Sequence, residues 1–261
     1  MKNLPKVSRR AALTFGVGAL AAFSARSSSA QSVHATADQP IVVELFTSQG
    51  CSSCPPADKL LGELAGQKNI IPLSMNVDYW DYLGWRDTLG SPEHTKRQKQ
   101  YAANRGTRQV YTPQMVINGH LNVVGSRRDQ VMRTLKQATA KTERVPMEIS
   151  TKGDEVIINV GENKNIPTPQ KATVWVLMTS QEVFVPIKRG ENSGKKITYH
   201  NVVRQIIPVG MWEGKAVQFK LPKASLDLGK KQDGKRDCVV LLQKGTVGEI
   251  WGVARAKDMS I

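Results

Sequence analysis

The sequence predicts an α/β domain followed by an all-β, sandwich-like domain, and three observations lead to this assignment. Over residues 41–144, apolar β-branched runs alternate with segments of helical periodicity. Over residues 145–261, the chain holds only short strand candidates, separated by turns rich in Gly, Pro, Asn and Lys. The length of 261 residues, with 40% hydrophobic residues, is enough for two domains with cores of their own.

The first domain is expected to follow the order β-α-β-α-β-β-α. Its first two strands should be parallel, because the helix between them makes a right-handed crossover. Two prolines open that helix, where their missing N–H groups would be unpaired in any case. The predicted elements are a strand at 41–46, a helix at 55–66, a strand at 70–77, a helix at 92–105, a strand and tight turn within 110–120, a strand at 121–124 and a helix at 126–137.

The second domain is expected to be an antiparallel sandwich that serves packing or recognition. Among its turns, the run 188–204 is the best candidate for a loop that reaches a site in the first domain. The predicted strands are 147–150, 155–160, 173–179, 182–187, 202–207, 216–221, 237–243 and 249–255.

Residues 1–30 have the pattern of an export signal, with a basic start, an apolar stretch at 11–23 and small residues before the expected cleavage point. The adjacent Arg9 and Arg10 are typical of a twin-arginine signal, with the ordinary secretory route or an uncleaved anchor as alternatives. Residues 31–40 are interpreted as a flexible lead-in. The mature chain is therefore expected to be periplasmic or secreted, with no membrane span of its own.

A Cys-x-x-Cys pair, Cys51 and Cys54, lies between the first strand and the first helix. Backbone N–H groups and the helix dipole favour the thiolate at this position, which makes Cys51 the better nucleophile and Cys54 the resolving cysteine. The intervening Ser52 and Ser53 can donate hydrogen bonds to that thiolate and tune its reactivity. The pattern indicates a redox-active disulfide, with a purely structural disulfide as the alternative.

Four aromatic residues follow the second strand: Tyr79, Trp80, Tyr82 and Trp85. They open an aromatic and helical insertion at residues 78–105. Ligands of open α/β sheets bind at the carboxyl ends of the strands, where this cluster falls. The cluster is therefore expected either to pack the inserted helix or to line a client or ligand groove beside the cysteines.

The element order, the Cys-x-x-Cys pair and the Thr112-Pro113 dipeptide before the third strand together resemble the thioredoxin fold. The resemblance implies a cis Thr112–Pro113 bond and pairing of the substrate backbone beside Pro113, with Thr112 tuning the site. It also implies a buried acid six residues before Cys51. Leu45 stands at that position and Glu44 precedes it, so Glu44 is the candidate acid.

At finer grain, three stretches resemble a secreted bacterial thioredoxin-like family described as a domain of unknown function. They are residues 44–58, 76–85 and 190–204. This resemblance covers most of the mature chain, whereas the thioredoxin resemblance covers only residues 41–140. It implies the architecture and no established reaction.

The chain is basic, with a net charge of +15, but the excess is spread evenly and few aromatic residues lie between the charges. Such a distribution is a poor match to a nucleic-acid groove, and we expect a solvated basic surface that attracts acidic clients or anionic lipid. The third cysteine, Cys238, lies in an apolar run. It is interpreted as a buried free thiol, with a third redox thiol as the alternative.

The sequence therefore favours an exported thiol–disulfide oxidoreductase whose only redox group is the Cys51–Cys54 pair. Its expected partners are protein or small thiol clients and a redox partner. Two alternatives remain at this point. One is a non-catalytic binding module built on the same scaffold, and the other is a copper-binding or delivery protein that uses the two cysteines as soft ligands. Nothing in the sequence organises a hydrolase triad or a carboxylate pair.

Overall fold

The computed structural model describes residues 40–139, 144–166, 171–228 and 235–259. The export signal predicted at 1–30, and the lead-in predicted at 31–40 except for its last residue, lie outside these ranges. The described residues belong to one compact unit. Within the described ranges, no helix is long and apolar enough to cross a membrane.

The first half of the unit contains three helices, four strands and one short 3-10 turn, in the order β-α-β-α-β-β-α apart from that turn. Local sequence explains the helix starts, since Pro55 and Pro56 open α1 and the Ser91 side chain accepts the Glu93 N–H at the start of α2. The elements are β1 (Ile41–Thr47), α1 (Pro55–Ala65), β2 (Ile70–Asn76), η1 (Asp81–Leu83), α2 (Pro92–Asn104), β3 (Gln114–Ile117), β4 (Leu121–Val124) and α3 (Arg128–Thr139).

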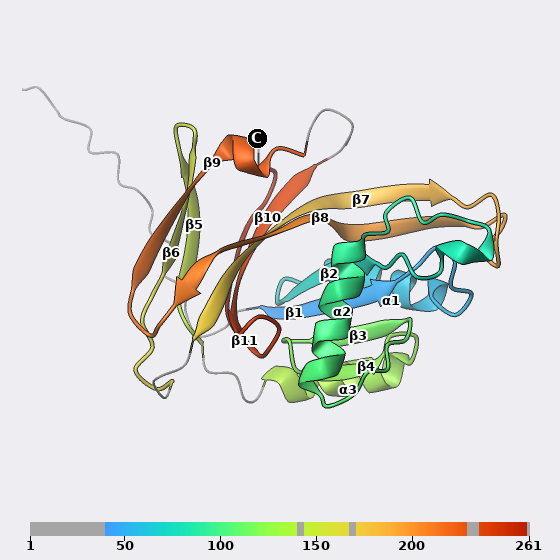
Figure 1. Ribbon diagram of the computed structural model, residues 1–261, viewed down its shortest axis with the longest axis horizontal. Helices are drawn as coiled ribbons and strands as arrows, with labels where there is room; N and C mark the ends of the chain where they lie inside the picture. The colour runs from blue at the N-terminus through green and yellow to red at the C-terminus, as the bar shows by residue number, and fades with distance from the viewer. Residues whose placement is uncertain (1–39, 140–143, 167–170, 229–234, 260–261) are drawn as a thin grey trace, which may run out of the picture. The chain divides into compact units, whose positions relative to one another are not determined.

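The second half is almost entirely strand, as Figure 1 shows. Its elements are β5 (Met147–Lys152), β6 (Glu155–Val160), β7 (Ala172–Pro186), β8 (Lys196–Trp212), β9 (Val217–Pro222), the 3-10 turn η2 (Lys223–Leu226), β10 (Arg236–Lys244) and β11 (Ile250–Ala256). Strands β5, β6 and β9 form a small sheet of three. The other four strands join those of the first half in one eight-stranded sheet of order β11-β10-β7-β8-β2-β1-β3-β4.

The boundary predicted between residues 144 and 145 is therefore not a boundary between sheets. Strand β8 lies parallel to β2, with Val202 opposite Ser74, so the second half extends the sheet of the first. The segments predicted as separate strands at 173–179 and 182–187 are one strand, β7. The polar Ser180 and Gln181 separate the two apolar runs in the sequence, but the pairing with β8 continues on both sides of them.

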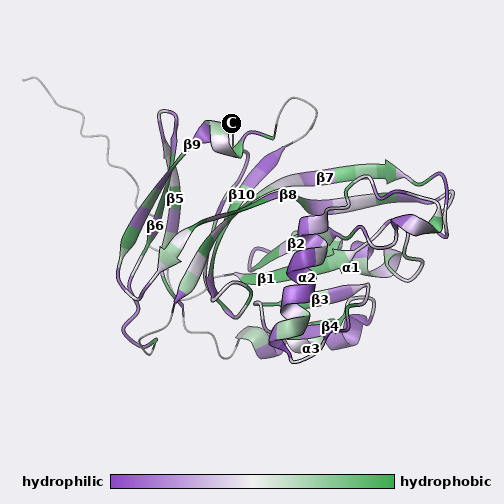
Figure 2. Cartoon of the chain, viewed as in Figure 1, coloured by the Kyte–Doolittle hydropathy of each residue, from purple (hydrophilic) through white to green (hydrophobic). Residues whose placement is uncertain are grey.

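Residues on β1 alternate between the two faces of the sheet. Val43 and Leu45 pack with α1 and α3, whereas Val42 and Phe46 pack with Tyr101 of α2. Figure 2 shows the result, with hydrophobic β1 between helices whose outer residues are hydrophilic. A further core, which includes Trp212 and Trp251, fills the space between the three-stranded sheet and the larger one.

Candidate functional site

Cys51 and Cys54 form a disulfide at the turn between β1 and α1, with their Cα atoms 5.4 Å apart. Cys54 stands at the N-cap of α1, where its carbonyl accepts the N–H groups of Ala57 and Asp58. Cys51 is 3% exposed and Cys54 is fully buried. The disulfide thus lies at the positive end of a helix, with Cys51 the nearer of the two to solvent.

The two serines between the cysteines are exposed. The Ser53 hydroxyl lies 3.4 Å from Cys51 Sγ. The backbone N–H of Ser52 donates to Glu191 Oε2 at 3.3 Å. Of the two serine side chains, that of Ser53 therefore has a contact with the Cys51 sulfur.

The Thr112–Pro113 peptide bond is cis, as the resemblance implied. The indole Nε1 of Trp80 donates to Thr112 Oγ1 at 2.8 Å, and the same residue packs against Gly50. A Cβ at Gly50 would lie 3.1 Å from Trp80 Cβ, so only glycine allows this approach without movement. Trp80 therefore holds the Thr-Pro loop beside the residue that precedes Cys51.

The other three aromatic residues of the insertion lie in different environments. Trp85 Nε1 donates to Gln49 Oε1 at 2.8 Å, just before the cysteines. Tyr82 is 77% exposed and stacks on Trp80, with 6.4 Å between the ring centroids. Tyr79 packs in the core next to α2, and burial raises its pKa to about 12. Trp80 and Trp85 therefore support the cysteine turn, Tyr79 packs in the core, and Tyr82 leaves its ring exposed to solvent.

The connection between β7 and β8 reaches the cysteine turn, as the sequence predicted for the run 188–204. Asn192 is fully buried, and its Nδ2 donates to the carbonyls of Gln49 at 2.9 Å and Cys51 at 2.8 Å. Lys195 Nζ donates in turn to Asn192 Oδ1 at 2.7 Å. The prediction was too long at its far end, because residues from Lys196 onward belong to strand β8.

Asp87 supports the turn from the opposite side, and sequence reasoning missed it. Its carboxylate accepts the N–H of Gln49 at 2.7 Å, the N–H of Leu89 at 2.8 Å and Asn76 Nδ2 at 3.1 Å. Burial raises the pKa of Asp87, and these hydrogen bonds oppose that shift. Two buried polar residues, Asp87 and Asn192, therefore fix the backbone of the turn from both sides.

Glu44 does not lie beneath the cysteines. Its carboxylate is fully buried, pairs with Arg97 Nε at 2.6 Å and accepts the Tyr101 hydroxyl. Both partners are on α2, so Glu44 shares the sheet face of Val42 and Phe46, opposite to α1. The structure gives Glu44 the role of joining β1 to α2, which corrects its candidacy as the acid of the site.

The buried acid on the α1 side is Asp58, which the sequence analysis did not single out. It lies one helical turn after Cys54, is 2% exposed, and neither carboxylate oxygen has a hydrogen-bond partner. Burial raises its pKa well above the usual value, and the neighbouring Thr47 hydroxyl opposes the shift only in part. The available signal was an acid on the apolar face of α1, between Ala57 and Leu61.

Cys238 is a buried free thiol in β10, as interpreted from the sequence. Burial raises its pKa to about 12, with a smaller contribution from Asp237. Among the described residues, no group of three or more His, Cys, Asp or Glu side chains is placed to hold a metal ion.

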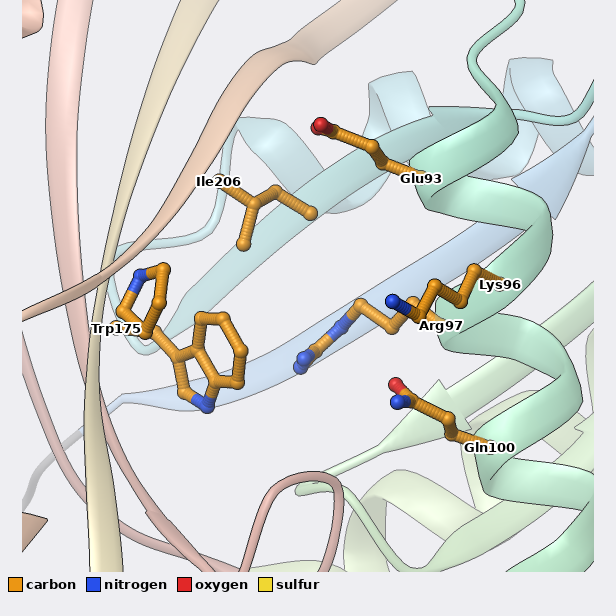
Figure 3. A pocket seen from close by; sticks show the side chains of 7 residues that line it. Glu93, Lys96, Arg97, Gln100, Trp175 and Ile206 are labelled. Atoms are coloured by element: carbon orange, nitrogen blue, oxygen red, sulfur yellow. The ribbon is translucent and has the colours of Figure 1, made fainter.

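Two of the hollows on the surface lie near elements of the first half. One, of about 240 Å³, lies between α2 and strands β7 and β8; Figure 3 shows Arg97 reaching from the helix toward Trp175 across it, and no residue of the cysteine turn lines it. The other runs along α1 from Pro55 to Glu63, and Lys59, Lys195 and Lys196 line it. This second hollow places basic side chains along the helix that the cysteines precede.

A family described as a protein of unknown function, DUF1223, matches residues 42–243. A crystal structure of a protein from Agrobacterium tumefaciens is 36% identical, with a TM-score of 0.71 over 85% of this chain and 95% of that one. HBP35 of Porphyromonas gingivalis is only 11% identical, but it shares the fold with a TM-score of 0.54 over 84% of this chain and 75% of the other. A comparison with curated proteins gives no match.

Proposed function

We propose that this chain, which belongs to the DUF1223 family, is a thiol–disulfide oxidoreductase that acts through Cys51 and Cys54. The observation that carries the proposal is the disulfide itself, at the N-terminus of α1, where Trp80 contacts both Gly50 and Thr112. Helix N-termini lower thiol pKa values and so favour the reactive thiolate. A purely structural disulfide would not need that placement.

The surroundings of the disulfide also support a reactive role. Asn192, Asp87 and Trp85 hold the residues just before the cysteines, while Ser52 and Ser53 stay exposed. A rigid backbone with an accessible edge is the arrangement that a positioned nucleophile requires. In this proposal the clients are proteins or small thiols, and the client backbone lies beside Pro113.

We place this chemistry on a thioredoxin-like scaffold. Strand β1 is parallel to β2 and antiparallel to β3, β3 is antiparallel to β4, and helices cover both faces. These pairings and the two helical layers support the proposed scaffold. The strands of the second half extend that scaffold at the β2 edge through β8.

In the exchange itself, a client thiolate attacks Cys51 Sγ, because Cys54 is fully buried. A bond forms between the client sulfur and Cys51, the Cys51–Cys54 bond breaks, and Cys54 leaves as the thiolate. A second client thiolate then attacks the client sulfur of the mixed disulfide, which releases Cys51 and oxidises the client. The reverse sequence reduces a client disulfide. We further propose that the chain works after export, where clients of this kind occur.

The test is to trap clients covalently. Cys54→Ala leaves Cys51 without its resolving partner, so mixed disulfides with clients should accumulate on non-reducing gels and disappear with reductant. Cys238→Ala is the matched control, because it removes a cysteine outside the site and should trap nothing. If Cys54→Ala traps no client, and the wild-type pair does not equilibrate with glutathione, the oxidoreductase proposal is wrong.

The copper alternative has a separate measurement. Stoichiometric copper in the purified reduced protein, lost in Cys51→Ser, would favour metal delivery over disulfide exchange.

A further inference from the structure

The strongest feature that the proposed function leaves unexplained is a buried acid whose two oxygens have no partner. We propose that Asp58 gives a proton to the Cys54 sulfur when the disulfide opens and takes it back when the disulfide closes. This inference rests on the proposed function, since it concerns the same cysteines. It assigns the acid of the site to helix α1 and not to strand β1.

The helix geometry brings the two residues together. The Asp58 N–H donates to the Cys54 carbonyl at 3.1 Å, so the residues stand one turn apart on the same side of α1. Helical side chains lean toward the N-terminus, which directs the Asp58 carboxyl over the turn that contains Cys54. Both side chains are shielded from solvent, with exposures of 2% for Asp58 and 0% for Cys54.

The groups around Asp58 do little to stabilise its ionised carboxylate. Thr47, at the end of β1, lies beside the carboxyl, and Tyr199 faces it from β8. The hydroxyls of both residues are buried and have no hydrogen-bond partner. The charged group that acts on Asp58 is Asp87, whose like charge disfavours ionisation further. Asp58 therefore keeps its proton at a pH where an exposed carboxyl would have lost it.

A proton donor is needed at this place because of what opening the disulfide does. Attack on Cys51 Sγ sends the electron pair of the broken bond to Cys54 Sγ, which becomes a thiolate with no exposed surface. An isolated buried anion is costly. Transfer of the Asp58 proton converts Cys54 to a neutral thiol and leaves one carboxylate, so the atoms and charge balance. In the closing direction the carboxylate takes the proton back as Cys54 attacks the mixed disulfide.

Glu44 is unsuited to the same task. Its carboxylate is already paired with Arg97 and hydrogen-bonded to Tyr101 on the other face of the sheet. Both of its carboxylate oxygens are therefore engaged by side chains of α2, away from α1 and the cysteines. In this proposal Asp58, on the α1 side of the sheet, takes part in the redox step. Glu44, on the α2 side, has a structural role.

The experiment measures how fast dithiothreitol opens the disulfide between pH 5 and 9, using the fluorescence of Trp80 and Trp85 near the site. Rates are expressed per concentration of dithiothreitol thiolate. In the wild type the rate should be high at low pH and fall as Asp58 loses its proton. In Asp58→Asn it should be at least tenfold lower at pH 6 and independent of pH, since general acid catalysis typically contributes about 10²-fold or more.

Tyr199→Phe is the matched control, because it removes a neighbouring buried hydroxyl without removing an acid. It should retain the wild-type rate and pH profile. The wild-type profile needs no variant to fold, so a wild-type rate that rises with pH over this range overturns the inference by itself. An Asp58→Asn protein that opens at the wild-type rate also overturns it, and leaves the oxidoreductase proposal standing. A wild-type disulfide that resists dithiothreitol throughout overturns both.

Discussion

Replacing Asn192 with alanine should loosen the cysteine turn more than any other single change in the second half. Asn192 is fully buried and makes three hydrogen bonds: two to the carbonyls of Gln49 and Cys51, and one from Lys195. Alanine keeps none of them. The Gln49 carbonyl is then left without this buried donor, whereas the Cys51 carbonyl keeps the Cys54 N–H at 3.2 Å.

The magnitude follows from those contacts. A net contribution of about 1 kcal/mol for each hydrogen bond gives a loss of about 3 kcal/mol in the free energy of unfolding. The Asn192 side-chain amide also fixes the backbone next to Cys51. Its loss should therefore make the disulfide easier to open. We expect faster reduction by dithiothreitol in Asn192→Ala, beyond the effect on global stability.

Urea unfolding measures the first effect, and the reduction rate under native conditions measures the second. Ser193→Ala is the matched control, because Ser193 is the exposed neighbour and its hydroxyl donates to the Lys188 carbonyl at 3.0 Å, away from the cysteine turn. It should change the free energy of unfolding by less than about 0.5 kcal/mol. If Asn192→Ala behaves like Ser193→Ala in both measurements, the second half does not hold the cysteine turn.

Three further changes probe the remaining parts of the site and the core. Glu44→Gln leaves the buried Arg97 without its counter-charge and should lower the free energy of unfolding by about 3–5 kcal/mol, while the folded fraction opens its disulfide at the wild-type rate; a loss of exchange without a loss of stability would return Glu44 to the redox step. Tyr82→Ser should leave stability within about 0.5 kcal/mol, because the ring is 77% exposed, and should slow exchange with a peptide client but not with dithiothreitol. Burial raises the Cys238 pKa to about 12, above its unfolded value of about 8.5, so the folded state holds the proton more tightly and stability should fall as pH rises through this interval. That fall should be smaller in Cys238→Ala, where the raised pKa of Tyr79 still contributes at the upper end, and a thiol reagent should label Cys238 only after unfolding.

Local patterns were enough to predict most of the first half. The strand at 121–124 agrees at both ends with β4, and the helix predicted at 92–105 differs from α2 by one residue. These elements carry their own signals, such as β-branched runs, a helix cap and a tight turn. The Cys-x-x-Cys pair and the Thr-Pro dipeptide were likewise readable, because each is a short run whose chemistry does not depend on distant contacts.

The second half shows where such reading stops. Residues 196–201 alternate exposed and buried side chains in β8, whereas the composition of the run 188–204 predicts a loop. That strand pairs with β7 and with β2, and the partner on β2 is more than a hundred residues away. Asn192 gave no local signal at all, since its burial depends on carbonyls 141 and 143 residues distant in the sequence. Asp58 differs from Asn192, because the sequence alone places this acid on the apolar face of a predicted helix.

The hairpin of β7 and β8 explains why the second half cannot be a detachable module. Its strands have 15 and 17 residues, so at about 3.3 Å per residue each spans roughly 50 Å. At one end Trp212 packs in the core beneath the three-stranded sheet, and at the other Asn192 holds the cysteine turn, as the course of the hairpin in Figure 1 illustrates. Between these ends, the buried Tyr199 on β8 lies close enough to Asp58 for the carboxyl to contribute to its raised pKa. Both the backbone before Cys51 and the surroundings of Asp58 therefore depend on a hairpin that the sequence analysis assigns to a second domain.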